Sequence, residues 1–177
     1  MQKAQAPGFT ALELLVTMAI IAITLAIAVP YLKNYNWNLR MQTAMDTLQT
    51  DLTLTRSSAL SYGIQTVICP AATKNECLRN SEWHKGWMVF ADLNGDRQRQ
   101  EGEPLLKKAN AIGLLTISSA RSRSNLRFHP NGTAAGSNAS VLFCDKRGSR
   151  YARKVILSNT GRIRTDSDGI SPTAACM

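Results

Sequence analysis

Two hydrophobic patterns follow each other without a break at the start of the chain. Residues 14–32 form a run of 19 residues without a charge, and 18 or more apolar residues are enough to cross a bilayer as a helix. Beyond this run, apolar residues recur at three- and four-residue steps, which predicts an amphipathic helix. Gly63 is a typical helix end, so we predict one helix from residue 9 to about residue 62, bent at Pro30. The predicted buried stripe is Met41, Ala44, Met45, Leu48, Leu52 and Ala59, and the predicted polar face is Arg40, Gln42, Asp46, Gln49 and Asp51.

After Gly63 the pattern changes to short β-rich runs separated by turn residues such as Asn94-Gly95. Without the apolar run, about 145 residues remain, which suits one domain. The fold class is therefore α+β, with a long N-terminal helix packed on a mostly antiparallel sheet. We predict strands at 65–69, 87–91, 113–118, 126–129, 140–144 and 154–158.

Glu13 is the unusual residue of the N-terminal segment. A carboxylate in a membrane helix costs roughly 2.5–3.5 kcal/mol at the bilayer centre, so it calls for a partner. An ordinary secretory signal carries its small-residue cleavage site after the apolar run, whereas Gly8 precedes it here. Cleavage after Gly8 would leave the apolar helix as a membrane anchor. The alternative is a plain signal anchor in which Glu13 has no role.

The sequence Gly8-Phe9-Thr10, followed by Glu13 and an apolar run, resembles the leader of type IV pilins and of type II secretion pseudopilins. The resemblance implies that a prepilin peptidase removes residues 1–8, cutting between Gly8 and Phe9, and methylates the amine of Phe9. It also implies that Glu13 meets the N-terminal amine of a neighbouring pilin in a filament. By the same resemblance, residues 9–33 lie in the inner membrane before assembly, residues 34–177 form a periplasmic headgroup domain, and the protein then enters a pilus at the cell surface.

Further motifs resemble the GspH/FimT branch of this family and imply the type IV pilin fold. They are residues 83–92 (WHKGWMVFAD), 94–96 (NGD), 102–106 (GEPLL) and 128–132 (FHPNG).

Four cysteines allow three disulfide pairings. A periplasmic location favours disulfides, and we expect Cys69 to pair with Cys77 and Cys144 with Cys176. A four-thiolate zinc site typically uses close Cys-x-x-Cys pairs, which this sequence lacks.

Basic residues gather near the C-terminus. Residues 121–164 contain ten Lys or Arg and one acid, Asp145, so this segment has a net charge of +9. This equals the net charge of the whole chain. Such a field attracts polyanions, namely DNA, anionic lipid headgroups or acidic protein faces. The alternative is a solvated basic surface that only aids solubility.

Within this region, Arg162 and Arg164 are two residues apart, so an extended chain presents both on one face and Ile163 on the other. The arginine side chain is suited to phosphate oxygens. Gly161-Arg162-Ile163-Arg164 resembles the Gly-Arg-x-Arg signature in the C-terminal region of FimT-like minor pilins, which bind DNA during natural transformation. The resemblance implies that Arg162 and Arg164 contact DNA and that Gly161 shapes the turn. Charge alone adds Lys146, Arg147, Arg150, Arg153 and Lys154.

The basic C-terminal region covers about residues 145–177, of which 165–177 is expected to be a tail held by Cys176. No aromatic residue lies within 161–177, so base stacking is not the expected source of affinity. Contacts to phosphates position a protein without reading sequence. We therefore expect sequence-independent, phosphate-led DNA binding.

Other chemistry finds little support. Residues 92–103 resemble a calcium loop, but Arg97 stands where the sixth-position glycine is required. His84 and His129 are too far apart in sequence to form a short metal-binding motif. The sequence also shows no recognisable pair of a catalytic nucleophile and its general base. We expect no enzyme activity, metal or cofactor. The alternative functions are a minor pilin that primes pilus assembly and a GspH-like pseudopilin of a type II secretion system.

Overall fold

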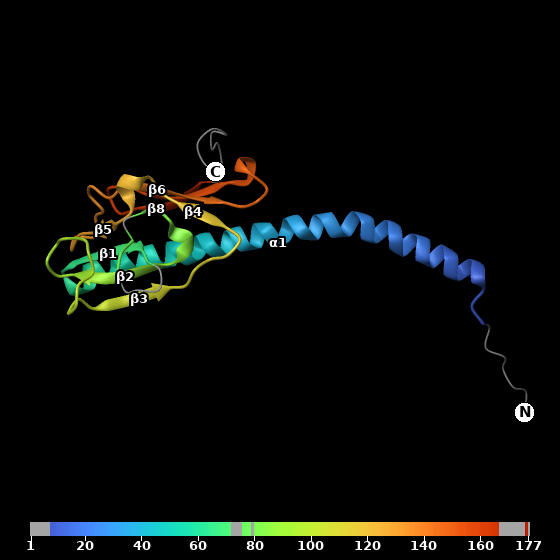
Figure 1. Cartoon of the computed structure of the whole chain (residues 1–177), viewed down its shortest axis with the longest axis horizontal. Helices are drawn as coiled ribbons and strands as arrows, with labels where there is room; N and C mark the ends of the chain where they lie inside the picture. Colours follow the sequence, from blue (N-terminus) through green and yellow to red (C-terminus); the bar gives the residue numbers. More distant parts are fainter. Residues whose placement is uncertain (1–7, 72–75, 79, 167–175, 177) are drawn as a thin grey trace, which may run out of the picture. The chain divides into compact units, whose positions relative to one another are not determined.

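The computed structural model describes residues 8–71, 76–78, 80–166 and 176 (Figure 1). Most of the expected leader, residues 1–7, therefore lies outside the described residues. The chain forms two compact units, Met1–Leu39 and Arg40–Met177. Helix α1, Ala11–Tyr62, contributes its apolar half to the first unit and its amphipathic half to the second. The helix begins two residues later than the sequence predicts and ends as predicted.

The first unit is the apolar half of α1. Thr10 caps its start, because the Glu13 amide donates to Thr10 Oγ1 at 3.3 Å. The helix continues through Pro30, and its most apolar 18-residue window has a mean hydropathy of 2.5 with no residue buried within the chain. Length and composition therefore allow this half of the helix to cross a membrane.

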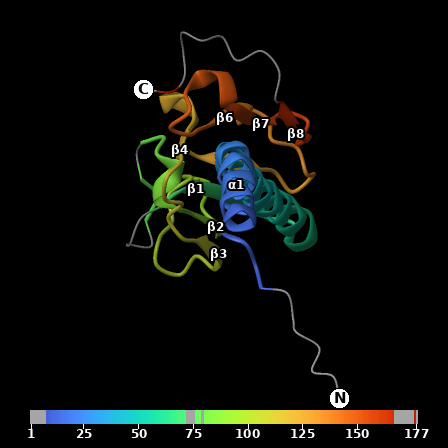
Figure 2. The ribbon, with the colours of Figure 1, turned by 90° about the vertical axis from the view of Figure 1, so that its right-hand side faces the viewer.

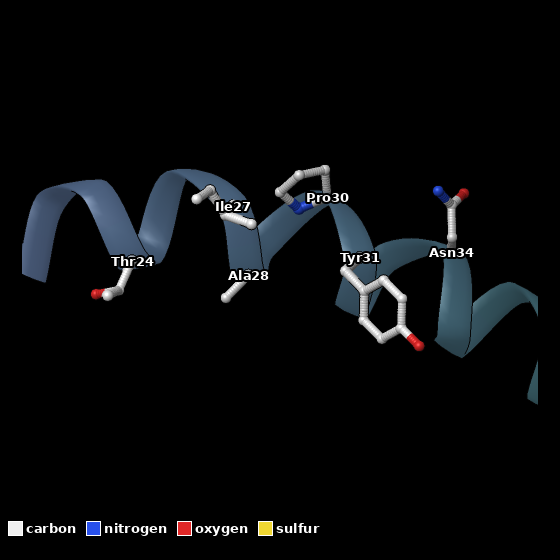
Figure 3. Close-up of a pocket in the computed structure, with 6 residues that line it drawn as sticks. All are labelled: Thr24, Ile27, Ala28, Pro30, Tyr31 and Asn34. Carbon is white, nitrogen blue, oxygen red and sulfur yellow. The ribbon is translucent and has the colours of Figure 1, made fainter.

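An open, mostly apolar groove lies on this half of the helix at Pro30 (Figure 3). The Thr24 hydroxyl turns back onto the helix and donates to the carbonyl oxygens of Ile20 and Ile21 at 3.0 and 2.9 Å. The polar group of Thr24 is thereby satisfied within the helix. The groove is lined by Thr24, Ile27, Ala28, Pro30, Tyr31 and Asn34.

The second unit contains two four-stranded sheets in which every neighbouring pair is antiparallel. Sheet A has the order β3-β2-β1-β5, with β1 Gln65–Pro70, β2 Trp87–Asp92, β3 Leu105–Ala109 and β5 Leu126–Phe128. Sheet B has the order β4-β6-β7-β8, with β4 Thr116–Ser118, β6 Ala139–Cys144, β7 Arg153–Leu157 and β8 Ile163–Asp166. The described part of this unit also contains three short 3-10 helices: η1 Trp83–Lys85, η2 Arg121–Arg123 and η3 Ser149–Tyr151.

The amphipathic half of α1 packs between these sheets, which lie on different sides of it in both views (Figures 1 and 2). All six residues of the predicted stripe are buried, so this prediction is confirmed. On the sheet side the largest buried side chains include Trp83, Trp87, Phe90, Phe128 and Phe143. Trp87 lies on the face of sheet A that contacts the helix, whereas Phe90 lies on the other face, in a cluster with Val67, Cys69, Ala71 and Met88.

Asp51 departs from the prediction, because it was expected on the polar face of the helix and is fully buried. Its Oδ2 accepts a hydrogen bond from Trp87 Nε1 at 2.8 Å, and its Oδ1 lies 2.5 Å from Lys107 Nζ. A buried carboxylate is tolerated when it is paired and hydrogen-bonded. Asp51 thus joins the helix to β2 and β3 of sheet A.

Candidate nucleic-acid interface

The Gly-Arg-x-Arg motif forms part of the turn between β7 and β8 and the first residues of β8. The Gly161 amide donates to the Ser158 carbonyl at 2.9 Å, and the Ser158 amide donates to the Arg162 carbonyl at 3.0 Å. The Arg162 amide also donates to Ser158 Oγ at 3.2 Å. β8 then pairs with β7 along its length, with Ile156 opposite Arg164. Thr165 and Asp166 therefore belong to a strand, and the prediction that the tail begins at residue 165 is wrong for these two residues.

Gly161 sits against a second turn. Its φ is 79°, and a Cβ atom there would lie 2.2 Å from the carbonyl oxygen of Gly132. The same oxygen accepts a hydrogen bond from Arg56 Nε of α1 at 3.0 Å. The Ala134 amide donates to the Asn159 carbonyl at 2.9 Å. The Pro-Asn-Gly turn, the hairpin and α1 thus fix one another, and only glycine fits at position 161.

Arg162 and Arg164 are both exposed, while Ile163 between them is half-buried. This is the alternation that an extended segment predicts. Among the described residues, no acidic side chain pairs with either arginine. Both guanidinium groups are therefore available to an anion.

The structure separates the supporting residues from these two arginines. Lys146, Arg147 and Arg150 lie in the connection from β6 to β7, whereas Gly161 follows the other end of β7. A five-residue strand is about 13 Å long at about 3.3 Å per residue. Lys146, Arg147 and Arg150 thus lie at the end of sheet B opposite to the hairpin that carries Arg162 and Arg164.

Arg147, Lys154 and Arg153 each contact a side chain elsewhere in the chain. Arg147 Nη2 lies 2.7 Å from Asp145 Oδ2, and the guanidinium group stacks 4.3 Å from the centre of the Tyr151 ring. Lys154 Nζ lies 3.0 Å from Asp166 Oδ2.

The third of these residues is Arg153, whose Nη1 donates to Gln42 Oε1 of α1 at 3.3 Å and so faces the helix. Lys146 and Arg150 are exposed. Exposure and charge thus favour Lys146 and Arg150 over the other three as supporting contacts.

Residues 44–161 match the protein family described as type II transport protein GspH. The chain belongs to this family. Its fold is that of two crystal structures of the type IV minor pilin FimU of Pseudomonas aeruginosa. The first is 23% identical with a TM-score of 0.59, and the match covers 77% of this chain and 100% of the FimU chain. The second is 22% identical with a TM-score of 0.61, and the match covers 81% of this chain and 99% of the FimU chain. No curated protein is significantly similar in sequence.

This GspH-family chain contains the two disulfides expected from its sequence, Cys69–Cys77 and Cys144–Cys176. The first links the end of β1 to the following connection, and the second ties Cys176 to the end of β6. Residues 167–175 lie outside the described residues, so most of the expected tail does as well.

The calcium-like loop of this GspH-family chain uses its carboxylates internally. The Asp92 carboxylate accepts hydrogen bonds from the backbone amides of Gly95 and Arg97 at 2.8 and 3.2 Å. The Glu103 carboxylate accepts hydrogen bonds from the backbone amides of Leu93 and Gln100 at 2.9 Å each. Burial raises the pKa of Asp92, and the two amide hydrogen bonds oppose that shift. These carboxylates brace a turn, and no cluster of three metal-ligating side chains occurs in the part of the chain that the structure describes.

Arg121 and Arg123 begin and end η2 and match none of the motifs in the sequence. Arg121 is exposed, and Arg123 is half-buried at the edge of sheet B. The signal that could have identified them is the absence of any acidic residue between Glu103 and Asp145.

Proposed function

We propose that this protein is a minor type IV pilin that binds DNA through Arg162 and Arg164 and supports DNA uptake in natural transformation. The observation that carries the proposal is the exposure of both guanidinium groups, without an acidic partner among the described residues, on a hairpin fixed by Gly161. Charge-assisted hydrogen bonds from arginine to phosphate oxygens are among the stronger polar contacts in proteins.

The same proposal covers the N-terminal segment. A prepilin peptidase cuts between Gly8 and Phe9 and methylates Phe9, and Glu13 pairs with the new amine of a neighbouring pilin. The apolar half of α1 anchors the chain in the inner membrane, with the second unit in the periplasm, and then enters a pilus. Family membership and the exposed apolar surface of residues 11–32 support this assignment.

DNA binding of this kind is led by phosphates and is independent of sequence, because the motif offers guanidinium groups and no aromatic platform. Each phosphate neutralised on duplex DNA contributes a slope of about −0.9 to the logarithm of the binding constant against the logarithm of salt concentration. A few contacts per subunit give weak, salt-sensitive binding. Several copies along one fibre would raise the total affinity.

Arg162→Gln combined with Arg164→Gln is expected to remove two phosphate contacts. The slope should then fall by about 1.8, and near 0.1 M salt the dissociation constant should rise on the order of 60-fold, because each contact contributes about eightfold over one decade of salt. Fluorescence anisotropy of a labelled duplex with the full chain in a nonionic detergent, measured across a salt series, checks this.

A matched control is Lys85→Gln combined with Lys108→Gln, which removes two exposed positive charges near sheet A. The control should retain both affinity and slope. Unchanged binding by the Arg162/Arg164 variant would reject this site. No binding by the unaltered chain at low salt would reject DNA binding altogether.

One finding favours a second function, a pseudopilin of a type II secretion system, because residues 44–161 match the type II transport protein GspH. A pseudopilin, like a minor pilin that primes pilus assembly, needs protein interfaces and no affinity for phosphate. Measuring transformation frequency and protein secretion in cells that lack the chain separates these functions. The DNA-uptake proposal expects transformation to fall and secretion to continue.

A further inference from the structure

We propose that the DNA-binding surface continues from the β7–β8 hairpin across the outer face of sheet B to η2, where Arg121 and Arg123 bind further phosphates of the same strand. This inference rests on the proposed DNA binding and extends that site to two arginines on a different element. The groove between the two pairs of arginines would seat the sugar–phosphate backbone.

Topology brings the two pairs to one end of sheet B. The hairpin follows the C-terminal end of β7, and Leu157 at this end pairs with Ala139 at the start of β6. β4 runs antiparallel to β6, with Ser118 opposite Leu142, so the chain leaves β4 towards this same end and enters η2. Figure 2 shows β6, β7 and β8 side by side in this sheet.

The outer face of the sheet connects the pairs. Ser140 lies opposite Ile156, and Ile156 lies opposite Arg164, so these three side chains form one row on one face. Arg153 and Ile156 are three residues apart in β7, so their side chains lie on opposite faces of the sheet. Because Arg153 contacts α1, the row that contains Ile156 lies on the face directed away from the helix. The row spans two strand spacings, about 10 Å. This length corresponds to roughly three phosphates along one DNA strand, at about 3.4 Å of axial rise each.

A groove occupies the space between this row and η2. Its chemistry is mixed, with hydroxyl and amide groups beside the aliphatic side chain of Ile156, and none of its lining residues is aromatic. Such a lining suits a deoxyribose ring and its phosphates better than a stacked base. The lining residues are Ala120, Ser122, Arg123, Asn138, Ala139, Ser140, Ile156 and Leu157.

Arg123 is held in place at this groove without being neutralised. Its Nη1 donates to the Gly136 carbonyl at 2.9 Å, and its Nη2 donates to Asn138 Oδ1 at 3.3 Å. Both acceptors are uncharged, so the positive charge of Arg123 remains uncompensated while the side chain is oriented. A pre-oriented arginine loses less conformational entropy when it binds a phosphate.

Charge distinguishes this end of the sheet from the other. Asp145 and Asp166 both lie at the opposite end, where they pair with Arg147 and Lys154. Because the sequence has no acid between Glu103 and Asp145, neither η2 nor the segment leading into β6 carries a negative charge. A one-signed field of this kind concentrates a polyanion at the groove.

The test compares Arg121→Gln combined with Arg123→Gln against the unaltered full chain in nonionic detergent, using anisotropy of a labelled duplex. We expect the salt slope to fall by about 1.8 and the dissociation constant near 0.1 M salt to rise on the order of 60-fold. Ser140→Glu, an exposed position within the row, should weaken binding at least tenfold without removing an arginine. The thermal unfolding midpoint of each variant verifies folding.

The outcomes separate this inference from the proposed function. If the Arg162/Arg164 variant loses affinity while the Arg121/Arg123 variant and Ser140→Glu keep the unaltered affinity and slope, the extension to η2 is wrong and the hairpin site stands. If the unaltered chain does not bind DNA, both fail. Should Arg121→Gln with Arg123→Gln unfold the chain, Ser140→Glu decides: tenfold weaker binding supports the extended surface, and unchanged binding overturns it.

Discussion

Asp51→Ala is expected to lower the free energy of unfolding of the second unit by about 2–4 kcal/mol. The substitution leaves the buried Trp87 indole N–H without its acceptor, which costs about 1–3 kcal/mol. Removing one partner of a fully buried ion pair costs about 3–5 kcal/mol, but Lys107 is 41% exposed and can turn to water. The expected loss therefore lies below that of a fully buried pair. Chemical denaturation of the full chain in detergent, followed by near-ultraviolet circular dichroism, measures it.

Asp46→Ala provides the matched control, since Asp46 is exposed on the same helix and its carboxylate accepts a hydrogen bond from the exposed side chain of Gln42 at 2.8 Å. It should change stability by less than about 0.5 kcal/mol. Asp51→Asn should fall between the two, because an amide oxygen can still accept from Trp87. Equal stability of the Asp51→Ala and Asp46→Ala proteins would show that the carboxylate does not join α1 to sheet A.

Asp51 also shows what periodicity can and cannot predict. The three- and four-residue repeat identifies the apolar stripe of α1, because burial of apolar side chains sets that period. It assigns any polar residue outside the repeat to solvent. Asp51 is buried because sheet A covers this side of the helix and supplies Trp87 and Lys107 as partners, and the partners of a side chain do not appear in its own helix pattern.

The sequence pattern likewise predicts some strands and not others. Each of the six predicted runs overlaps an observed strand, but the run at 113–118 forms a strand only over Thr116–Ser118, since Leu114 adopts a positive φ of 68°. β3, Leu105–Ala109, was not predicted, because two lysines interrupt its apolar pattern. Its place beside β2 comes from tertiary pairing. For the same reason the sequence predicted one sheet and the structure has two.

At the candidate site, local alternation correctly predicted that Arg162 and Arg164 lie on one face of the strand and Ile163 on the other. A count of charges groups them with Lys146, Arg147, Arg150, Arg153 and Lys154, because it treats neighbours in sequence as neighbours in space. Lys154 meets Asp166 only through the β7–β8 register. Such pairings depend on strand register, which a count of charges does not contain.

Gly161→Ala is expected to weaken DNA binding without removing a charge. An alanine Cβ would lie 2.2 Å from the Gly132 carbonyl oxygen, so the hairpin must move away from the turn to which Arg56 also binds. The left-handed conformation adds about 1–2 kcal/mol for any residue with a Cβ. We expect the unfolding free energy to fall by at least about 2 kcal/mol, because overpacking typically adds about 1–3 kcal/mol to that strain. The salt slope for DNA should fall towards that of the Arg162/Arg164 variant.

Gly95→Ala separates steric contact from backbone strain. Gly95 has a φ of 81°, close to that of Gly161, but a Cβ atom at this position would meet nothing within 4 Å. It should therefore cost only the strain of about 1–2 kcal/mol and leave DNA affinity unchanged. If the two alanine variants matched in stability and in binding, contact with the Gly132 turn would not fix the hairpin. If Gly161→Ala alone lost affinity, the position of the arginines, rather than their charge alone, would determine how tightly phosphate is held.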